Sequence, residues 1–362
     1  MRMVVLIGAL VLLAPASARA GTYDVVSCAA PGAGGVNHSL TYAATSFDPQ
    51  YNGQVGGWYQ GDASCAGGLL AQSRTVDGTV ARWLTGANWS FNAPAGTDIV
   101  GFWSTRFGEA RDSGGDDANT PFVDESDHWR ADVVDDSGQP IGGAAGGETC
   151  AHGGGVPYCT IGSSGGARRD HRLVAKQLRW QITCAGEIVF GCPTSYGGYP
   201  LATMAIYATQ VTLEDRSAPA ASLAGPLVGP GWHRPAEPVS YSATDNSGIR
   251  RAALSAGPVS ARDPRACDFT YPVPCSNAAG RALRFSGRLP DGRYPLTLTV
   301  TDAAGNPRVV RAPVSIDGTP PAVDLRRPRA RTIIVRAKDF ASGFAGGRID
   351  VRNSSAEQYR PL

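Results

Sequence analysis

The stretch Pro290-Asp-Gly-Arg-Tyr-Pro-Leu-Thr-Leu-Thr-Val-Thr-Asp-Ala-Ala-Gly-Asn306 places an alternating run between two turn sequences. Its Pro-Asp-Gly start supplies the backbone angles of a tight turn. Leu296, Leu298 and Val300 then alternate with threonines, which is the period-2 pattern of a β-strand with one buried face. The Asp-Ala-Ala-Gly-Asn end turns the chain into a second alternating run at residues 310–316. The stretch therefore predicts two neighbouring antiparallel strands.

A segment that precedes this stretch occurs again after it. Asp215-Arg-Ser-Ala-Pro-Ala-Ala-Ser-Leu223 recurs as Asp317-Gly-Thr-Pro-Pro-Ala-Val-Asp-Leu325, which begins 102 residues later. An alternating run and an acidic turn follow each copy. These features indicate an internal repeat of about a hundred residues. The second copy is much shorter, so we expect residues 318–362 to be the start of a second, incomplete repeat in a truncated chain.

The runs VTDAAGN at residues 300–306 and TDNSGI at residues 244–249 resemble the bacterial Ig-like repeats of secreted and surface proteins. The resemblance covers residues 215–317 and implies an Ig-like β-sandwich. Tyr294 stands where the tyrosine corner of such a sandwich would lie, at the start of the penultimate strand. The cysteines depart from the pattern, because Cys267 and Cys275 are close neighbours and do not flank a tryptophan.

Residues 21–214 form a separate region that holds six of the eight cysteines and six of the seven tryptophans. Glycine and proline are frequent in the chain, at 46 and 26 residues, which predicts many short strands and turns. We predict an all-β protein in which this region is a larger sandwich of the jelly-roll type. It resembles the concanavalin-like domains that precede Ig repeats in actinobacterial secreted proteins. Four tryptophans in alternating runs are expected in its core: Trp83, Trp103, Trp129 and Trp180.

The first twenty residues predict export. Arg2 precedes a short apolar run at residues 4–13, and Ala18-Arg-Ala20 forms a small-x-small cleavage site before Gly21. The run is too short to span a bilayer, so residues 1–20 are expected to be a signal peptide and the mature chain to be extracellular. Removing two arginines with the leader leaves 31 basic and 31 acidic residues (33 − 2 = 31), so nucleic acid and anionic membrane surfaces are not expected partners.

The eight cysteines of an exported chain predict a disulfide framework. Most of them fall in close pairs in separate segments of the chain, which favours pairing between sequence neighbours. A zinc site is the rival interpretation, but no C-x-x-C motif occurs. The expected pairs are Cys28–Cys65, Cys150–Cys159, Cys184–Cys192 and Cys267–Cys275.

No catalytic constellation stands out. Ser113 and Ser164 lie in glycine-rich motifs that resemble nucleophile segments, but neither has the histidine or the strand–turn–helix context that catalysis needs. The acidic stretch at residues 112–127 does not match a calcium-loop spacing and is expected to be a solvated loop. The sequence therefore assigns no catalytic residue, no cofactor and no metal site.

Aromatic residues in two glycine loops are the candidate ligand contacts. Trp58 and Tyr59 lie in one loop, and Tyr196 and Tyr199 in another. Flat apolar rings beside polar groups suit sugar binding. We therefore expect a non-catalytic extracellular binding or adhesion protein with a polysaccharide or cell-surface ligand. A secreted carbohydrate-active hydrolase and a purely structural component of the cell envelope remain the alternatives.

Overall fold

The structure is a computed structural model of the chain, and its regular elements are β-strands. It describes residues 20–28, 35–44, 55–58, 65, 68–73, 75, 80–81, 84–111, 129–142, 148–151, 158–162, 168–185, 192–329, 332–351, 358 and 360–361. Within these residues there is no α-helix, and the helical turn η2 (Pro226–Val228) is short. The all-β prediction is confirmed.

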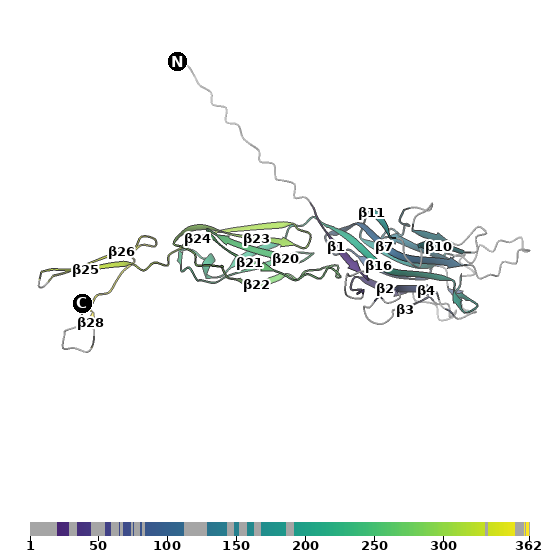
Figure 1. The fold of residues 1–362 in the computed structure, drawn as a ribbon, viewed down its shortest axis with the longest axis horizontal. Helices are drawn as coiled ribbons and strands as arrows, with labels where there is room; N and C mark the ends of the chain where they lie inside the picture. The colour runs from purple at the N-terminus through teal and green to yellow at the C-terminus, as the bar shows by residue number, and fades with distance from the viewer. Residues whose placement is uncertain are drawn as a thin grey trace, which may run out of the picture.

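The N-terminal part is a sandwich of two antiparallel sheets (Figure 1). Strands of the two sheets contact each other across the interior, β12 against β16 and β4 against β6. One sheet has seven strands: β1 (Gly21–Ser27), β3 (Val55–Trp58), β4 (Leu69–Ser73), β7 (Thr97–Arg111), β10 (Tyr158–Gly162), β11 (Arg169–Ala175) and β16 (Ala202–Asp215). The other has five: β2 (Leu40–Ala44), β6 (Gly86–Asn92), β8 (Trp129–Asp135), β9 (Thr149–Ala151) and β12 (Gln177–Cys184).

Tryptophans fill the centre of this sandwich. Trp129 and Trp180 are completely buried, as predicted. Trp103 is only half-buried, because it lies on the outer face of β7, where the Arg168 guanidinium stacks on its ring at 4.6 Å. The core prediction is therefore wrong for Trp103, and Trp83 lies outside the described residues.

The alternation of Val174, Leu178, Trp180 and Ile182 predicts a single strand, but these residues belong to two strands, β11 and β12. The chain bends at Lys176, whose Nζ donates a hydrogen bond to the carbonyl oxygen of Thr97 at 2.7 Å. This bend ends β11 and begins β12. Val174 therefore belongs to β11 and is 77% exposed, whereas Leu178 lies on β12 and is buried.

A buried ion pair joins the two layers of the N-terminal sandwich. Arg106 on β7 and Glu148, next to β9, are both completely buried and form a salt bridge. His171 on β11 approaches the other carboxylate oxygen of Glu148, with Nε2 at 2.7 Å. The His171 ring stacks on Phe102 with ring centroids 4.9 Å apart. Glu148 is thus shared by two partners from the opposite sheet.

The second body is a smaller sandwich with its own core. Leu296, Leu298 and Val300 are buried in it, which confirms the alternation read from the sequence. Tyr294 donates a hydrogen bond from its hydroxyl to the carbonyl oxygen of Asp291 at 3.3 Å. One sheet contains β17 (Ala220–Ala224), β19 (Val239–Thr244) and β22 (Ala278–Leu283). The other contains β18 (Trp232–His233), β20 (Ile249–Ala256), β21 (Val259–Pro264), β23 (Gly292–Asp302) and β24 (Pro307–Ile316).

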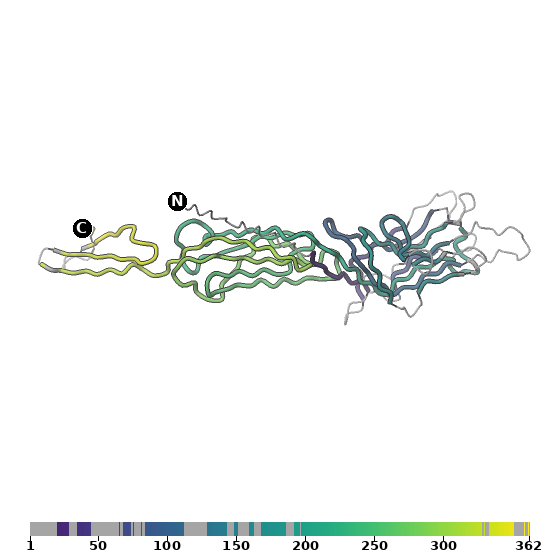
Figure 2. The backbone as a smooth tube through the Cα atoms, turned by 90° about the horizontal axis from the view of Figure 1, so that it is seen from above, coloured from purple at the N-terminus to yellow at the C-terminus, as the bar shows by residue number. Residues whose placement is uncertain are grey.

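The remaining strands form two-stranded ladders. In the C-terminal part, β25 (Ala322–Arg329) pairs with β26 (Thr332–Lys338), and β27 (Asp350–Val351) pairs with β28 (Arg360–Pro361). In the N-terminal sandwich, β5 (Val80–Ala81) pairs with β13 (Cys192–Pro193), and β14 (Ser195–Tyr196) pairs with β15 (Tyr199–Pro200). Two perpendicular views show the sandwiches lying end to end, with the β25–β26 hairpin beyond them (Figures 1 and 2).

Four disulfides close loops of this fold. They join the sequence neighbours that the spacing predicts, and no described cysteine is free. Four disulfides indicate an oxidising compartment outside the cytoplasm. Among the described residues, no helix is long and apolar enough to cross a bilayer. The pairs are Cys28–Cys65, Cys150–Cys159, Cys184–Cys192 and Cys267–Cys275.

Candidate metal centre

Three of the four residues that the sequence marks as ligand contacts lie on strands of the N-terminal sandwich. Tyr199 is 69% exposed beside the Gly197-Gly198 turn that joins β14 to β15. Both glycines have positive φ, at 60° and 82°, which suits a two-residue hairpin turn. Tyr196 pairs with Tyr199 across this hairpin, and Trp58 ends β3. The side chains of Tyr196 and Trp58, and all of Tyr59, fall outside the described residues, as do Ser113, Ser164 and residues 112–127.

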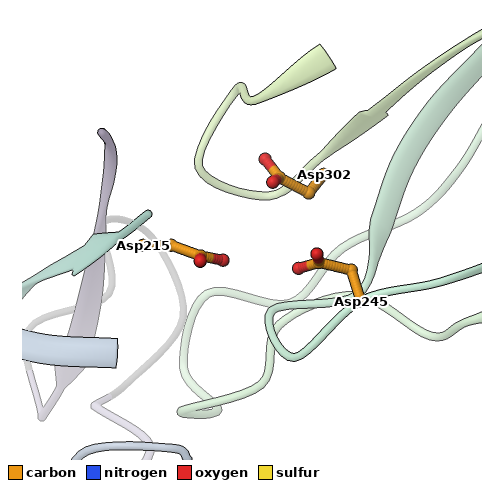
Figure 3. A group of neighbouring side chains, drawn as sticks. All are labelled: Asp215, Asp245 and Asp302. Atoms are coloured by element: carbon orange, nitrogen blue, oxygen red, sulfur yellow. The ribbon is translucent and has the colours of Figure 1, made fainter. Parts of the chain in front are cut away.

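Three aspartates meet where the two sandwiches join. Asp215 is the last residue of β16, Asp245 directly follows β19, and Asp302 is the last residue of β23. One carboxylate oxygen of each lies within 4.8 Å of those of the other two. Figure 3 shows the three carboxylates pointing toward one another across the junction. Strand ends from both sandwiches therefore build one acidic cluster.

Local turns fix the direction of each carboxylate. The backbone N–H of Ser217 donates to Asp215 Oδ1 at 2.9 Å, and the N–H of Ser247 donates to Asp245 Oδ1 at the same distance. Asp302 accepts from the backbone N–H of Asn306 at 2.7 Å and from its Nδ2 at 2.9 Å. Such turns are typical of aspartate, whose side chain caps backbone N–H groups a few residues further on. The carboxylates are thus held in place before any ligand binds.

The electrostatics of the cluster disfavour three negative charges. Burial raises the pKa of Asp302 to about 6, and repulsion from the other two aspartates adds to this shift. Burial and repulsion from Asp215 also raise the pKa of Asp245. Among the described residues, no arginine, lysine or histidine forms an ion pair with any of the three. The charge of the cluster is therefore left uncompensated by side chains.

One oxygen of the cluster lacks a hydrogen-bond partner. Asp215 is completely buried, and its Oδ2 accepts no hydrogen bond from any described residue. A buried carboxylate oxygen without a partner carries a large desolvation cost. A hard cation bound by carboxylate oxygens would offset that cost, and oxygen ligands without nitrogen or sulfur favour hard cations such as calcium over softer metals such as zinc and copper. The donor set therefore fits a calcium ion held by Asp215, Asp245 and Asp302.

A disulfide-closed loop makes the second contact between the sandwiches. The Cys267–Cys275 loop places Phe269 near Tyr23, and the backbone N–H of Val26 on β1 donates to the Phe269 carbonyl at 2.9 Å. The Tyr23 hydroxyl also donates to a loop carbonyl, that of residue 272, at 2.9 Å. The loop thus docks on the first strand of the N-terminal sandwich.

The same loop contacts His38. The His38 ring stacks on Tyr271, with ring centroids 4.2 Å apart, and its Nδ1 lies 2.8 Å from Thr270 Oγ1. The junction therefore has two parts, the aspartate cluster and the docked loop. The two parts restrain the orientation of the sandwiches through different chemistry.

Sequence reasoning did not find this cluster. The three aspartates are separated by 30 and 57 residues, and only folding brings them together. A signal was nevertheless present, because Asp215 and Asp245 have counterparts in the second repeat copy, Asp317 and Asp339. An acidic residue that recurs at equivalent places of a repeat indicates a role at the boundary between repeats.

Lowering the pH is expected to stabilise the calcium-free protein. A carboxyl group with a raised folded-state pKa binds its proton more tightly in the folded state, so this contribution to stability falls as the pH rises from about 4 to about 6. The melting temperature in EDTA should therefore rise by several degrees between pH 7 and pH 5, owing to Asp302. Differential scanning calorimetry checks this. Asp302→Asn should flatten the trend, and an unchanged trend in that variant would contradict the assignment.

No family model matches the chain, and no curated protein matches it. Among solved structures, the chain is similar to a calcium binding mutant of Bacteroides uniformis beta-glucuronidase 2, with 9% identity and a TM-score of 0.15. The match covers 87% of this chain and 34% of that one, so the chain spans about a third of the length of that protein. A TM-score this low supports no argument about function.

Proposed function

We propose that this chain is an exported, non-catalytic binding or adhesion protein whose Ig-like domain holds the N-terminal sandwich in a fixed orientation. In this proposal a calcium ion bound by Asp215, Asp245 and Asp302 braces the junction. The observation that carries it is the convergence of three carboxylates from both sandwiches around a buried oxygen without a partner. The leader sequence and the four disulfides support export.

The geometry favours bracing over catalysis at this cluster. The carboxylates terminate strands of two different bodies, so a cation that binds all three links those bodies directly. Asp215 and Asp302 are buried, which leaves little access for a macromolecular substrate. Asn306 strengthens the link, because its Nδ2 also donates to the carbonyl oxygen of Asp215 at 3.0 Å. Calcium would thus stabilise one orientation of the two sandwiches.

Calcium is expected to raise the melting temperature of the EDTA-treated protein. Binding to the folded state alone contributes about 2.7 kcal/mol when calcium is at a hundred times its dissociation constant. Asp245→Asn should weaken binding about tenfold or more, because it removes one charged ligand. Asp24→Asn is the matched control, since Asp24 is exposed on nearby β1 and lies outside the cluster. If isothermal titration calorimetry shows no heat of binding at millimolar calcium, the calcium site is wrong.

The expected ligand of the N-terminal sandwich is a polysaccharide. The exposed Tyr199 ring at the tip of the β14–β15 hairpin supports this proposal, because a flat apolar ring offered to solvent suits a sugar face. A pull-down of the full chain against soluble and insoluble polysaccharides, with sugar release measured in parallel, tests it. Binding without release, weakened by Tyr199→Ala, is the expected result. Release of sugars would favour the hydrolase, and neither binding nor release would favour a structural role in the envelope.

A further inference from the structure

The first strand of the N-terminal sandwich begins inside the junction. Gly21 is the first residue of β1 and pairs with Asp215 of β16. Its backbone nitrogen donates a hydrogen bond to Asn306 Oδ1 at 3.0 Å. The other side-chain atom of Asn306, Nδ2, donates to Asp302 Oδ2 at 2.9 Å. The side chain of Asn306 therefore connects the Gly21 nitrogen to Asp302 of the acidic cluster.

The junction leaves no room for a side chain at this position. A Cβ atom built on Gly21 would lie 2.4 Å from the carbonyl oxygen of Ala304 and 2.8 Å from its carbonyl carbon. Both atoms belong to the backbone of the turn that follows β23, so neither can move away cheaply. Glycine is thus required here for close packing against the second sandwich.

The cleavage motif of the leader ends at the residue before this glycine. Ala18-Arg-Ala20 predicts hydrolysis of the Ala20–Gly21 peptide bond, which consumes one water molecule. The new carboxyl group leaves with the leader on Ala20. The nitrogen of Gly21 becomes an α-amino group, which has a pKa of about 8 in peptides and carries a proton at pH 7.

We propose that leader removal completes the junction, because the α-ammonium group of Gly21 supplies a positive charge at Asn306, whose side chain contacts both Asp215 and Asp302. The amide of an uncleaved chain offers one hydrogen at this place and no charge. The ammonium offers three hydrogens and a full charge, and Asn306 links it to a cluster of carboxylates that no described basic side chain neutralises. Cleavage at any other bond would leave a neutral amide or a displaced charge there.

This inference rests on export in the proposed function and does not depend on calcium. Three chains of otherwise identical sequence test it in EDTA at pH 7. The first begins with a free Gly21, the second begins with an acetylated Gly21, and the third begins with Ala20. The structure accommodates the acyl group of Ala20 on the Gly21 nitrogen, so acetylation removes the charge without introducing a clash.

The chain with free Gly21 is expected to melt several degrees above the other two. Asp302→Asn should reduce this difference by half or more, since it removes the carboxylate that Asn306 connects to Gly21. Mass spectrometry of protein exported from a bacterial host should give a mature chain that begins at Gly21. Equal melting temperatures for the three chains, or a mature chain that begins elsewhere, would overturn the proposal.

Calcium titration distinguishes the proposed role of Gly21 from the proposed calcium site. The acetylated chain should bind calcium several-fold more tightly than the free chain, because the ammonium repels the cation. If neither chain binds calcium while the melting difference persists, the calcium site is wrong and the role of Gly21 stands. If calcium binds equally to both chains and their melting temperatures agree, the role of Gly21 is wrong and the calcium site stands.

Discussion

Replacing Glu148 with alanine is expected to lower the free energy of unfolding of the N-terminal sandwich by about 3–5 kcal/mol. The variant leaves the Arg106 guanidinium completely buried and without its carboxylate partner. It also removes the partner of His171 Nε2. Chemical denaturation followed by tryptophan fluorescence measures the loss, because Trp129 and Trp180 lie in the same core.

Two further variants separate charge from packing. The double variant Arg106→Met and Glu148→Met should recover most of the lost stability, because replacing both partners by apolar residues of similar volume leaves no buried charge. His171→Gln should cost much less than Glu148→Ala, since the Arg106 pair remains. A loss below about 1 kcal/mol for Glu148→Ala would mean that water reaches Arg106 and that the pair does not behave as a buried one.

Replacing Cys267 and Cys275 with serine is expected to separate the unfolding of the two sandwiches. Loss of this short loop closure costs about 2–3 kcal/mol in the chain-entropy model. The loop also carries Phe269 and Tyr271, which contact β1 and His38 of the N-terminal sandwich. Differential scanning calorimetry in EDTA should show one transition for the parent chain and two for the variant.

The Cys184–Cys192 pair provides the matched control. It has the same sequence separation of 8 residues, but both cysteines lie in the core of the N-terminal sandwich, away from the junction. Its removal should lower the melting temperature but keep a single transition, because the docked loop still couples the two sandwiches. Separation of the transitions in both variants, or in neither, would contradict a specific role for the Cys267–Cys275 loop.

Local patterns predicted much of the fold. Alternation at residues 296–300 and turn chemistry on either side gave the β23–β24 ladder, because one buried face imposes a period of two on the residues of a strand. The cysteines paired between sequence neighbours as expected, and three of the four disulfides need only local closure, because their cysteines are eight or nine residues apart. The predictions were wrong where contacts between distant parts of the chain determine the local structure. Lys176 lies at the bend between β11 and β12 and bonds to the distant Thr97, and nothing in the local pattern marks that bond.

The candidate site was predicted less well, for a physical reason. Asp215, Asp245 and Asp302 each look like an ordinary turn aspartate, and each does cap a local turn. Their shared role depends on the relative placement of two sandwiches, which no local pattern specifies. The Arg106–Glu148 pair is hidden in the same way, because its partners are 42 residues apart on opposite sheets. The prediction of ligand contacts in the two aromatic loops rests on composition alone. Among the described side chains, the exposed ring of Tyr199 is the observation that bears on it.

The connection between the sandwiches is only four residues long, from the end of β16 at Asp215 to the start of β17 at Ala220. A linker of this length cannot act as a flexible tether when the aspartate cluster and the docked loop hold the domains on either side of it. The two sandwiches should therefore move as one rigid body, and a force applied to the N-terminal sandwich would reach the second sandwich as torque. A mechanical load would then act first on the aspartate cluster and the docked loop, and only later on the strands.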